Sequence, residues 1–303
     1  MNGVLTVDKP EGFTSFDVIA VVRKLTGQRK TGHTGTLDPN ATGVLPVLLG
    51  SATKAQDIIP NHDKTYEAEF RLGFTTDTLD IWGQQTATFS KTADAEQVEQ
   101  ALRPLRGDIM QVPPMYSAVK KDGKRLYDLA RQGVEVERKA RPVTVYRLTL
   151  DRFDEEQQTG SLTVSCSKGT YIRTLIDDMG SALGTGAVMT ALRRTQACGF
   201  SVEDCLTLEQ IRERAADGTL GDAVRSTESL FVCYSAVAVS DAQAKRFQNG
   251  GALALERTGL KNKTDIDKTV FRVKTRDGEF LGLGRADLSE GLLKIEKLFN
   301  TNT

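Results

Sequence analysis

Residues 64–73, KTYEAEFRLG, alternate between apolar and polar side chains, and no other segment restricts the fold as strongly. Successive side chains of a β-strand point to opposite faces, so this period of two predicts a strand with one buried and one solvated face. The predicted buried face carries Tyr66, Ala68, Phe70 and Leu72. The chain therefore needs a sheet that is covered on one side.

Further strands and helices are predicted on both sides of this segment, in irregular order. Apolar patterns and cap residues indicate strands over residues 3–9, 44–50, 141–150 and 160–169 and helices over residues 14–27, 94–107 and 170–184. From about residue 235 the pattern changes to a helix with a capping box near Ser240 and a hairpin that turns at Asp277-Gly278. This order predicts an α+β body followed by a small β-rich domain.

The composition is that of a soluble globular protein, with 39% hydrophobic and 26% charged side chains. Forty basic and 40 acidic residues cancel, so a polyanion has to bind to a local basic patch. No segment reaches the roughly 18 consecutive apolar residues of a membrane span, and no basic amino-terminal region precedes an apolar run. We therefore expect a cytoplasmic protein without a membrane contact.

The four cysteines and two histidines lack the spacing of a metal site. Cys166, Cys198, Cys205 and Cys233 include no C-x-x-C pair, and the H-x-E signature of zinc-dependent base deaminases is missing. Free cysteine usually packs as a small hydrophobic residue. We therefore expect no bound metal and four ordinary buried thiols.

Residues 27–43 form a polar, glycine-rich segment between a predicted helix and a predicted buried strand. Its first half, GQRKTGHT, nearly matches the phosphate-binding pattern G-x-x-x-x-G-K-[ST], but His33 stands where that pattern needs a lysine. We therefore expect no nucleotide cofactor. In its second half Asp38 precedes Pro39, and by local chemistry alone this pair favours an ordinary turn.

Residues 32–50, GHTGTLDPNATGVLPVLLG, closely resemble the catalytic signature G-H-x-G-x-L-D-P-x-A-T-G-x-L of the TruB family of tRNA pseudouridine-55 synthases. The resemblance continues in register through blocks at residues 5–15, 64–73, 111–131, 167–180 and 192–195, and it covers essentially residues 3–230. It implies an isomerase that flips uridine 55 out of the T-loop of tRNA and rejoins the base to ribose through C5. The family's reaction needs neither a cofactor nor a metal.

The same resemblance implies the architecture and the partner. Residues 1–232 are expected to form a catalytic domain with a mixed, largely antiparallel sheet flanked by helices, and residues 233–303 a PUA-like RNA-binding domain. A thumb-like insertion is expected at about residues 111–147, where nine Lys and Arg against four Asp and Glu give a charge of +5. This charge suits the phosphates of a tRNA T stem-loop. We expect the insertion to be mobile without RNA, and the protein to be a monomer.

Residue by residue, the resemblance implies that Asp38 is the catalytic carboxylate and that Arg173 is the arginine that pairs with it. The resemblance also implies that Tyr66 supports catalysis and stacks on the base, and that Tyr171 and Leu192 line the base pocket. It places His33 against the flipped nucleotide and Lys9 at the floor of the site. Taken alone, these residue types favour a solvated arginine and buried packing side chains.

Two other functions remain open from the residues themselves. A non-catalytic RNA-binding or RNA-folding protein needs the basic insertion and the β-rich tail but not Asp38. A glycosidase needs paired carboxylates and an activated water, whereas the loop carries one carboxylate. The sequence also leaves open whether Asp38 attacks C1′, adds to C6 or removes a proton from C2′, and whether acidic residues such as Asp77 and Asp80 have any role beyond solubility.

Overall fold

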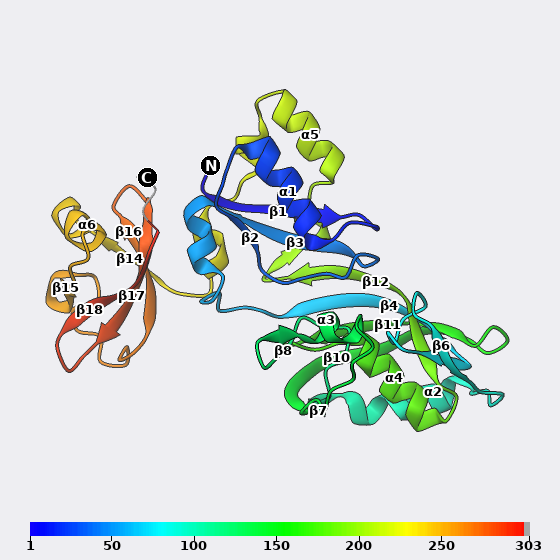
Figure 1. Cartoon of the computed structure of the whole chain (residues 1–303). Helices are drawn as coiled ribbons and strands as arrows, with labels where there is room; N and C mark the ends of the chain where they lie inside the picture. Colours follow the sequence, from blue (N-terminus) through cyan, green and yellow to red (C-terminus); the bar gives the residue numbers. More distant parts are fainter. Residues whose placement is uncertain (300–303) are drawn as a thin grey trace.

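The computed structural model describes residues 1–299 of the 303-residue chain (Figure 1). Its strands form one nine-stranded sheet, one five-stranded sheet and two short hairpins. The large sheet contains β1 (Gly3–Lys9), β2 (Thr31–His33), β3 (Thr42–Leu49), β4 (Lys64–Leu72), β7 (Gly107–Gln111), β10 (Arg141–Asp154), β11 (Thr159–Cys166), β12 (Ala187–Ala197) and β13 (Phe200–Ser201). The second sheet contains β14 (Ala236–Val239), β15 (Leu253–Ala254), β16 (Val270–Thr275), β17 (Phe280–Asp287) and β18 (Leu292–Leu298). The hairpins are β5 (Phe74–Thr76) with β6 (Gln85–Thr88), and β8 (Lys120–Lys121) with β9 (Lys124–Arg125).

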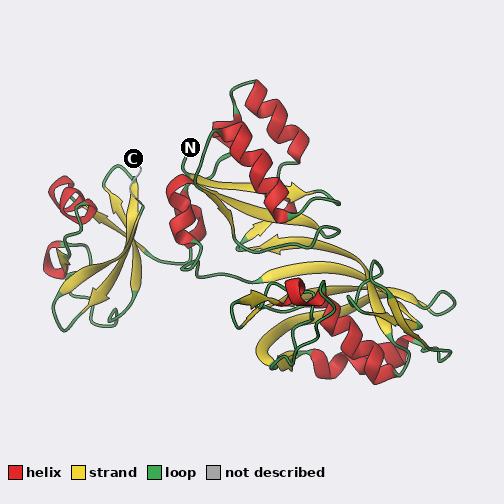
Figure 2. Cartoon of the chain, viewed as in Figure 1, coloured by secondary structure: helices red, strands yellow, loops and turns green. Residues whose placement is uncertain are grey.

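Helices cover these sheets (Figure 2). The α-helices are α1 (Ser15–Thr26), α2 (Ala95–Leu102), α3 (Leu126–Ala130), α4 (Ile172–Leu183), α5 (Leu208–Ala216) and α6 (Asp241–Gln248). Short 3₁₀ segments occur at Gly50–Ala55, Arg103–Leu105, Val202–Asp204, Leu220–Ala223, Thr227–Phe231 and Leu255–Arg257.

The large sheet consists of two halves that β12 joins. Its strand order is β1-β3-β12-β4-β11-β10-β7. β12 runs antiparallel to β4 along its whole length and parallel to β3 only at Arg193 and Arg194. In the described residues, every other neighbouring pair of this sheet is antiparallel. The expected mixed, largely antiparallel sheet is therefore confirmed.

Most predicted elements form where their local patterns indicate. In β4 the four apolar residues of the alternating segment are buried, while Glu67, Glu69 and Arg71 are exposed. Helix α1 begins after Thr14, whose side chain accepts a hydrogen bond from the backbone N–H of Asp17, and it ends at Gly27 with φ of 64°. The predicted strands and helices thus reflect burial on one face and side-chain capping at the ends.

Three details differ from the expectations. The helix expected over residues 94–107 ends at Leu102 and continues as a 3₁₀ turn, because Pro104 has no backbone N–H to extend the helix. The loop expected over residues 27–43 contains the short strand β2, which pairs with β3. The expectation of four buried thiols is confirmed for Cys166 and Cys198 but is wrong for Cys205, which is half-buried, and for Cys233, which is exposed.

Two groups of helices cover the two halves of the large sheet. α1 and α5 share a hydrophobic cluster with β1 and β3, whereas α2 and α4 pack against β4, β10, β11 and β12 (Figure 2). Each helix buries an apolar stripe against the apolar face of the strands beneath it. The loop between β2 and β3 lies where the two halves meet, beside β12, and Arg194 of β12 binds the Gly35 carbonyl oxygen of this loop.

The carboxyl-terminal sheet and α6 form the expected small β-rich unit (Figure 1). It is attached to the rest of the chain by a shared hydrophobic cluster, in which Leu283 and Phe299 lie with Val4, Val44 and Phe231. This contact consists of apolar side chains, and β1 and β3 contribute to it. Within residues 1–299, no helix is both long enough and apolar enough to cross a membrane.

Candidate active site

The loop between β2 and β3 carries Asp38 to the line where the two halves of the sheet meet. Ser15, at the start of α1, is completely buried and binds this loop twice: its Oγ donates to the Leu37 carbonyl oxygen at 3.2 Å and accepts from the Leu37 N–H at 2.9 Å. The backbone N–H of Ala41 donates to the Asp38 carbonyl oxygen at 3.1 Å, which closes a turn. The expected turn at Asp38 is therefore present and is held by a distant helix.

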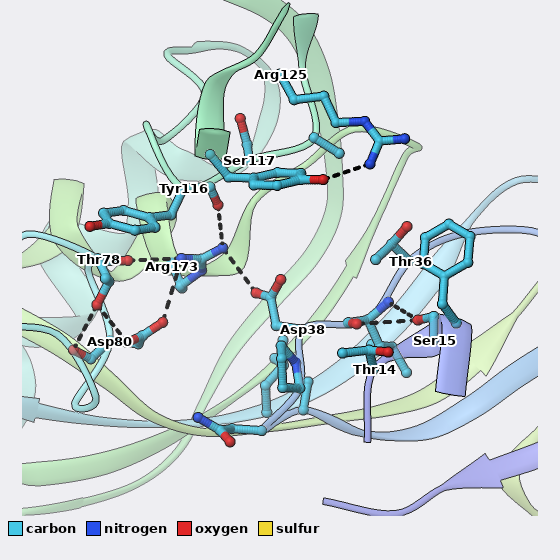
Figure 3. A pocket seen from close by; sticks show the side chains of 18 of the residues that line it. Thr14, Ser15, Thr36, Asp38, Thr78, Asp80, Tyr116, Ser117, Arg125 and Arg173 are labelled. Atoms are coloured by element: carbon cyan, nitrogen blue, oxygen red, sulfur yellow. Dashed lines mark hydrogen bonds and ion pairs between the residues drawn. The ribbon is translucent and has the colours of Figure 1, made fainter. Parts of the chain in front are cut away.

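Asp38 forms an ion pair with Arg173, as the resemblance implies (Figure 3). Nη2 of Arg173 lies 2.9 Å from Oδ2 of Asp38. The arginine side chain is only 7% exposed, whereas the aspartate side chain is 47% exposed. A buried guanidinium thus holds one oxygen of a carboxylate that lines the cavity and is nearly half exposed.

Arg173 has three further partners, all from outside the Asp38 loop (Figure 3). It donates to the carbonyl oxygens of Thr78 and Tyr116, each at 2.9 Å, and its Nη1 lies 3.4 Å from Oδ2 of Asp80. Four acceptors fix the plane of the guanidinium, which leaves it little freedom to rotate. These polar contacts therefore fix the position of Arg173, and Arg173 in turn orients the carboxylate of Asp38.

Asp80 is a second carboxylate at this site, and sequence reasoning left its role open. Its side chain is 14% exposed, and burial raises its pKa, against the effect of the hydrogen bond from Thr78 and of the Arg173 charge. Oδ1 accepts from the Thr78 hydroxyl at 2.6 Å and from the Trp82 N–H at 3.3 Å, while Oδ2 faces Arg173. Both oxygens are thus engaged, so Asp80 is poorly suited to activate a water molecule.

A cavity of about 660 Å³ opens above the ion pair. Asp38, Arg173, His33 and Leu192 line its inner part. Its cover comes from the segment between β7 and β10, which contributes Lys120, Arg125, Tyr127 and Arg131. Its volume lies within the range of about 300–1,000 Å³ that small-ligand sites occupy.

The basic residues of this cover have no acidic partner. None of Lys120, Arg125 and Arg131 forms an ion pair with a carboxylate of residues 1–299. Instead, the guanidinium groups of Arg125 and Arg131 each lie 5.6 Å from the centre of the Tyr127 ring. Their charge is therefore available for an anionic group that enters the cavity.

His33 and Leu192 lie where the resemblance implies, on the wall of the cavity. Burial, followed by the nearby Arg194 charge, lowers the pKa of His33, so its imidazole is neutral at neutral pH. Its ring meets the ring of Phe16 edge to face, with 5.6 Å between the centroids. Phe16 is itself 62% exposed at the rim.

Tyr66, Tyr171 and Lys9 lie close to Asp38 but do not line the cavity. Burial is the main cause that raises the pKa of both tyrosine hydroxyls, and the negative charge of Asp38 adds to it. Lys9 is fully buried and donates to the carbonyl oxygens of Pro10 and Pro39, each at 2.9 Å. Burial lowers its pKa to about 8. These three residues support the wall behind the Asp38 loop.

A further buried cation, Arg194 of β12, was not singled out from the sequence. It is completely buried, and its Nε donates to the Val44 carbonyl oxygen at 2.7 Å while Nη2 donates to that of Gly35 at 3.1 Å. Arg194 therefore fastens the Asp38 loop to the strand that joins the halves of the sheet. Nothing in its local sequence distinguishes it from Arg193, whose side chain is 38% exposed.

In residues 1–299, no group of three or more His, Cys, Asp or Glu side chains is placed to hold a metal ion. The site that the structure assembles consists of carboxylates, guanidinium groups and aromatic rings. It offers a carboxylate paired with a buried guanidinium, a cavity beside that carboxylate and a cationic cover.

Two family models match adjacent parts of the chain. Residues 23–172 match the TruB family pseudouridylate synthase (N terminal domain), and residues 173–232 match the tRNA pseudouridylate synthase B C-terminal domain. The tRNA pseudouridine synthase B of Clostridium novyi (strain NT) is 43% identical over 298 residues, which cover 98% of this chain and 99% of that protein. That of Geobacillus thermodenitrificans (strain NG80-2) is 46% identical over 263 residues, 84% of this chain and 86% of that protein.

Chains with the same fold occur in solved structures of larger complexes. A chain in the crystal structure of a Cbf5-Nop10-Gar1 complex superposes with a TM-score of 0.74 at 27% identity, over 98% of this chain and 85% of that chain. A chain in an H/ACA RNP bound to a substrate RNA containing 2′-deoxyuridine superposes with a TM-score of 0.73 at 25% identity, over the same shares. The similarity thus includes the carboxyl-terminal sheet as well as the body.

Proposed function

The chain belongs to the TruB family of pseudouridylate synthases and is a tRNA pseudouridine synthase, and we propose that it isomerises uridine 55 in the T-loop of tRNA with Asp38 as the catalytic carboxylate. The observation that carries the proposal is the ion pair between Asp38 and the buried Arg173 at the base of a cavity. No other described carboxylate combines an exposed oxygen with a buried cation at that cavity.

The reaction is an isomerisation, so every atom of the substrate is retained. The bond from ribose C1′ to uracil N1 breaks, the base turns, and C5 joins C1′; the proton on C5 then leaves and N1 takes up a proton. Each of the three possible roles of Asp38 requires an ionised carboxylate beside the ribose. Arg173 offsets the cost of holding that charge in a partly closed cavity.

Asp80 is the nearest competitor for the catalytic role. One oxygen of Asp80 accepts hydrogen bonds from Thr78 and Trp82, and the other faces Arg173. Asp38 instead binds Arg173 through one oxygen, and nearly half of its side chain is exposed. A glycosidase mechanism would need Asp80 free to activate water. The contacts therefore favour Asp38 as the reacting group and Asp80 as a residue that positions Arg173.

The remaining site residues surround the path of the base. We assign Leu192 and His33 to the cavity wall that the flipped uridine meets. Tyr66 is buried behind this wall, and we assign its ring to stacking on the uracil once the base has entered. Tyr171 belongs to the same rear wall, and Lys9 supports the floor through the Pro39 carbonyl. A base removed from its helical stack needs such a planar partner.

The RNA is held, in this proposal, by shape and charge rather than by base sequence. The thumb, residues 111–147, closes over the T stem-loop with Lys120, Arg125 and Arg131, whose charges are free of carboxylates. Residues 233–303 act as a PUA-like RNA-binding domain beside the catalytic domain of residues 1–232. The protein works as a cytoplasmic monomer.

The test is tritium release from an unmodified tRNA transcript labelled at uridine C5, without added metal or nucleotide. The native protein should release the label, and Asp38→Asn should not release it while it binds tRNA with unchanged affinity. Sequencing of the product should place pseudouridine at position 55 only. Labelled free uracil would instead indicate a glycosidase, and tRNA binding without release by the native protein would indicate a non-catalytic RNA-binding protein.

A further inference from the structure

Trp82 is the single tryptophan of the chain, and it is 47% exposed beside the active site. It lies in the turn between β5 and β6 and lines the cavity above Asp38. A second cavity, of about 630 Å³, adjoins the first. Asn40, Trp82 and Leu192 line both cavities, so Trp82 stands on the ridge between them. Because Trp82 lines both cavities, a ligand that occupies either of them would contact its indole ring.

The turn that carries Trp82 is fixed to the rest of the site. The backbone N–H of Ile81 donates to the Met189 carbonyl oxygen of β12 at 2.9 Å, and the N–H of Trp82 donates to Oδ1 of Asp80 at 3.3 Å. The other oxygen of Asp80 faces Arg173, which binds Asp38. Three successive contacts thus connect the backbone of Trp82 to the proposed catalytic carboxylate.

The charges on the two sides of the ridge differ. On the first side the cavity is covered by Lys120, Arg125 and Arg131, which attract phosphates. On the second side the walls carry two cations, Arg152 and Arg193, and more carboxylates, which are Glu11, Glu67, Glu69 and Asp151. Arg152 is paired with Glu69 at 2.9 Å, so the net charge of these walls is negative and disfavours phosphates. The sugar-phosphate backbone is therefore favoured on the first side, and only an uncharged part of the RNA, a base, is suited to reach the ridge.

We propose that Trp82 is a stacking platform for an unpaired nucleobase of the RNA substrate, a different base from the uridine that enters the cavity beside Asp38. The proposal rests on the proposed function, because it takes the substrate to be a structured RNA loop. Its basis is the position of an exposed indole on the ridge, the rigid turn beneath it and the charge difference across it. Stacking on an aromatic ring accepts any base, so Trp82 contributes affinity and orientation rather than sequence specificity.

The first experiment uses Trp82 as its own reporter, since no other tryptophan contributes to the fluorescence. The Asp38→Asn protein is titrated with an unmodified T stem-loop RNA and, separately, with the same stem as a continuous duplex without a loop. The stem-loop should quench the tryptophan fluorescence, and the duplex should not quench it when filter binding shows that it is bound. A bound stem-loop that leaves the fluorescence unchanged would overturn the proposal.

The second experiment measures affinity for the stem-loop by filter binding. Trp82→Ala should weaken binding by about 5- to 100-fold, the range expected for loss of one stacked base, and Trp82→Phe should restore most of it. Phe89 is the matched control: it follows β6 on the same hairpin, is 37% exposed and lines neither cavity. Phe89→Leu should bind as the native protein does, and equal affinity of Trp82→Ala and the native protein would contradict the stacking role.

Tritium release separates this inference from the proposed function. Trp82→Ala should raise the KM for tRNA in step with its weaker binding and should lower turnover by a smaller factor, whereas Asp38→Asn should lose turnover itself. A fall in turnover with an unchanged KM would contradict the stacking role. If the native protein releases tritium but its fluorescence does not change when the stem-loop binds, the stacking proposal is refuted and the proposed function is not. Absence of release by the native protein would refute the proposed function, whatever the fluorescence shows.

Discussion

Ser15 and Leu37 exchange two hydrogen bonds across 22 residues of sequence, through one buried hydroxyl. The Ser15 side chain thereby makes, with the backbone of the Asp38 loop, the two hydrogen bonds that a neighbouring strand would otherwise make. Because Leu37 directly precedes Asp38, the amino-terminal end of α1 fixes the position of the Asp38 backbone and so of its carboxylate. Removal of this hydroxyl should therefore affect both stability and turnover.

Ser15→Ala leaves the Leu37 N–H and carbonyl buried without a partner. We expect the free energy of unfolding to fall by about 1–3 kcal/mol and turnover to fall with it, while tRNA affinity stays the same. Urea unfolding and tritium release measure the two effects. Ser229→Ala is the control, because the Ser229 hydroxyl makes a local bond to the Ser226 carbonyl oxygen away from the cavity. A stable Ser15→Ala protein with native turnover would show that the loop holds itself in place.

Arg173→Met should lose activity by about 10²-fold or more, because the carboxylate loses its cation. It should also destabilise the fold by about 3–5 kcal/mol, since Oδ2 of the buried Asp80 then has no cation, although Oδ1 keeps its bonds from Thr78 and Trp82. Combination with Asp80→Asn should recover much of the stability and none of the activity. Recovery of turnover in the double variant would contradict the role of Arg173 at Asp38.

Lys9 should make stability depend on pH above neutrality. Burial lowers its pKa to about 8 from 10.5, so between these values the unfolded chain binds a proton that the folded chain lacks. The folded state therefore gains stability as pH rises through this window, by up to about 3 kcal/mol. Urea unfolding of the native protein and Lys9→Met at several pH values should show the difference between them changing in that direction. A constant difference would mean that Lys9 stays charged throughout.

His33 should contribute to RNA binding as a neutral ring. Because burial lowers its pKa below the usual 6.5, less than half of the imidazole is charged at pH 6.5, and this fraction falls further as the pH rises. The native protein and His33→Gln should therefore show the same change of tRNA affinity between about pH 6.5 and 8 at constant salt. Filter binding measures this. A rise in affinity towards low pH in the native protein alone would indicate a charged His33.

The segment between β7 and β10 should become resistant to trypsin when tRNA binds. It carries several Lys and Arg residues, and its described contacts with the site include the Tyr116 carbonyl on Arg173 and the Tyr116 hydroxyl 3.4 Å from Asp77. We expect cleavage within residues 112–140 to be fast in the free protein and slow in the complex. Equal cleavage in both states would count against closure of the thumb.

Much of the fold followed from local patterns. The alternation over residues 64–73 predicted β4, and the apolar periods with their caps predicted α1, α4 and α6, because burial on one face and side-chain capping act within a few residues. The helix boundary at Leu102 was predicted less well, since the residues after it can still form a 3₁₀ turn. The signature in residues 32–50 identified the family and, with it, the expected pairing of Asp38 with Arg173.

What the sequence by itself determined is the set of elements, the family and the carboxylate proposed for catalysis. Only the tertiary structure decided that Asp80, Thr78 and Tyr116 meet at Arg173, that Arg194 is buried while Arg193 is not, and that Trp82 stands between two cavities. These contacts join segments far apart in the chain. Their geometry depends on how the two halves of the sheet pair with β12. A local pattern of residues does not encode how such distant segments are placed relative to one another.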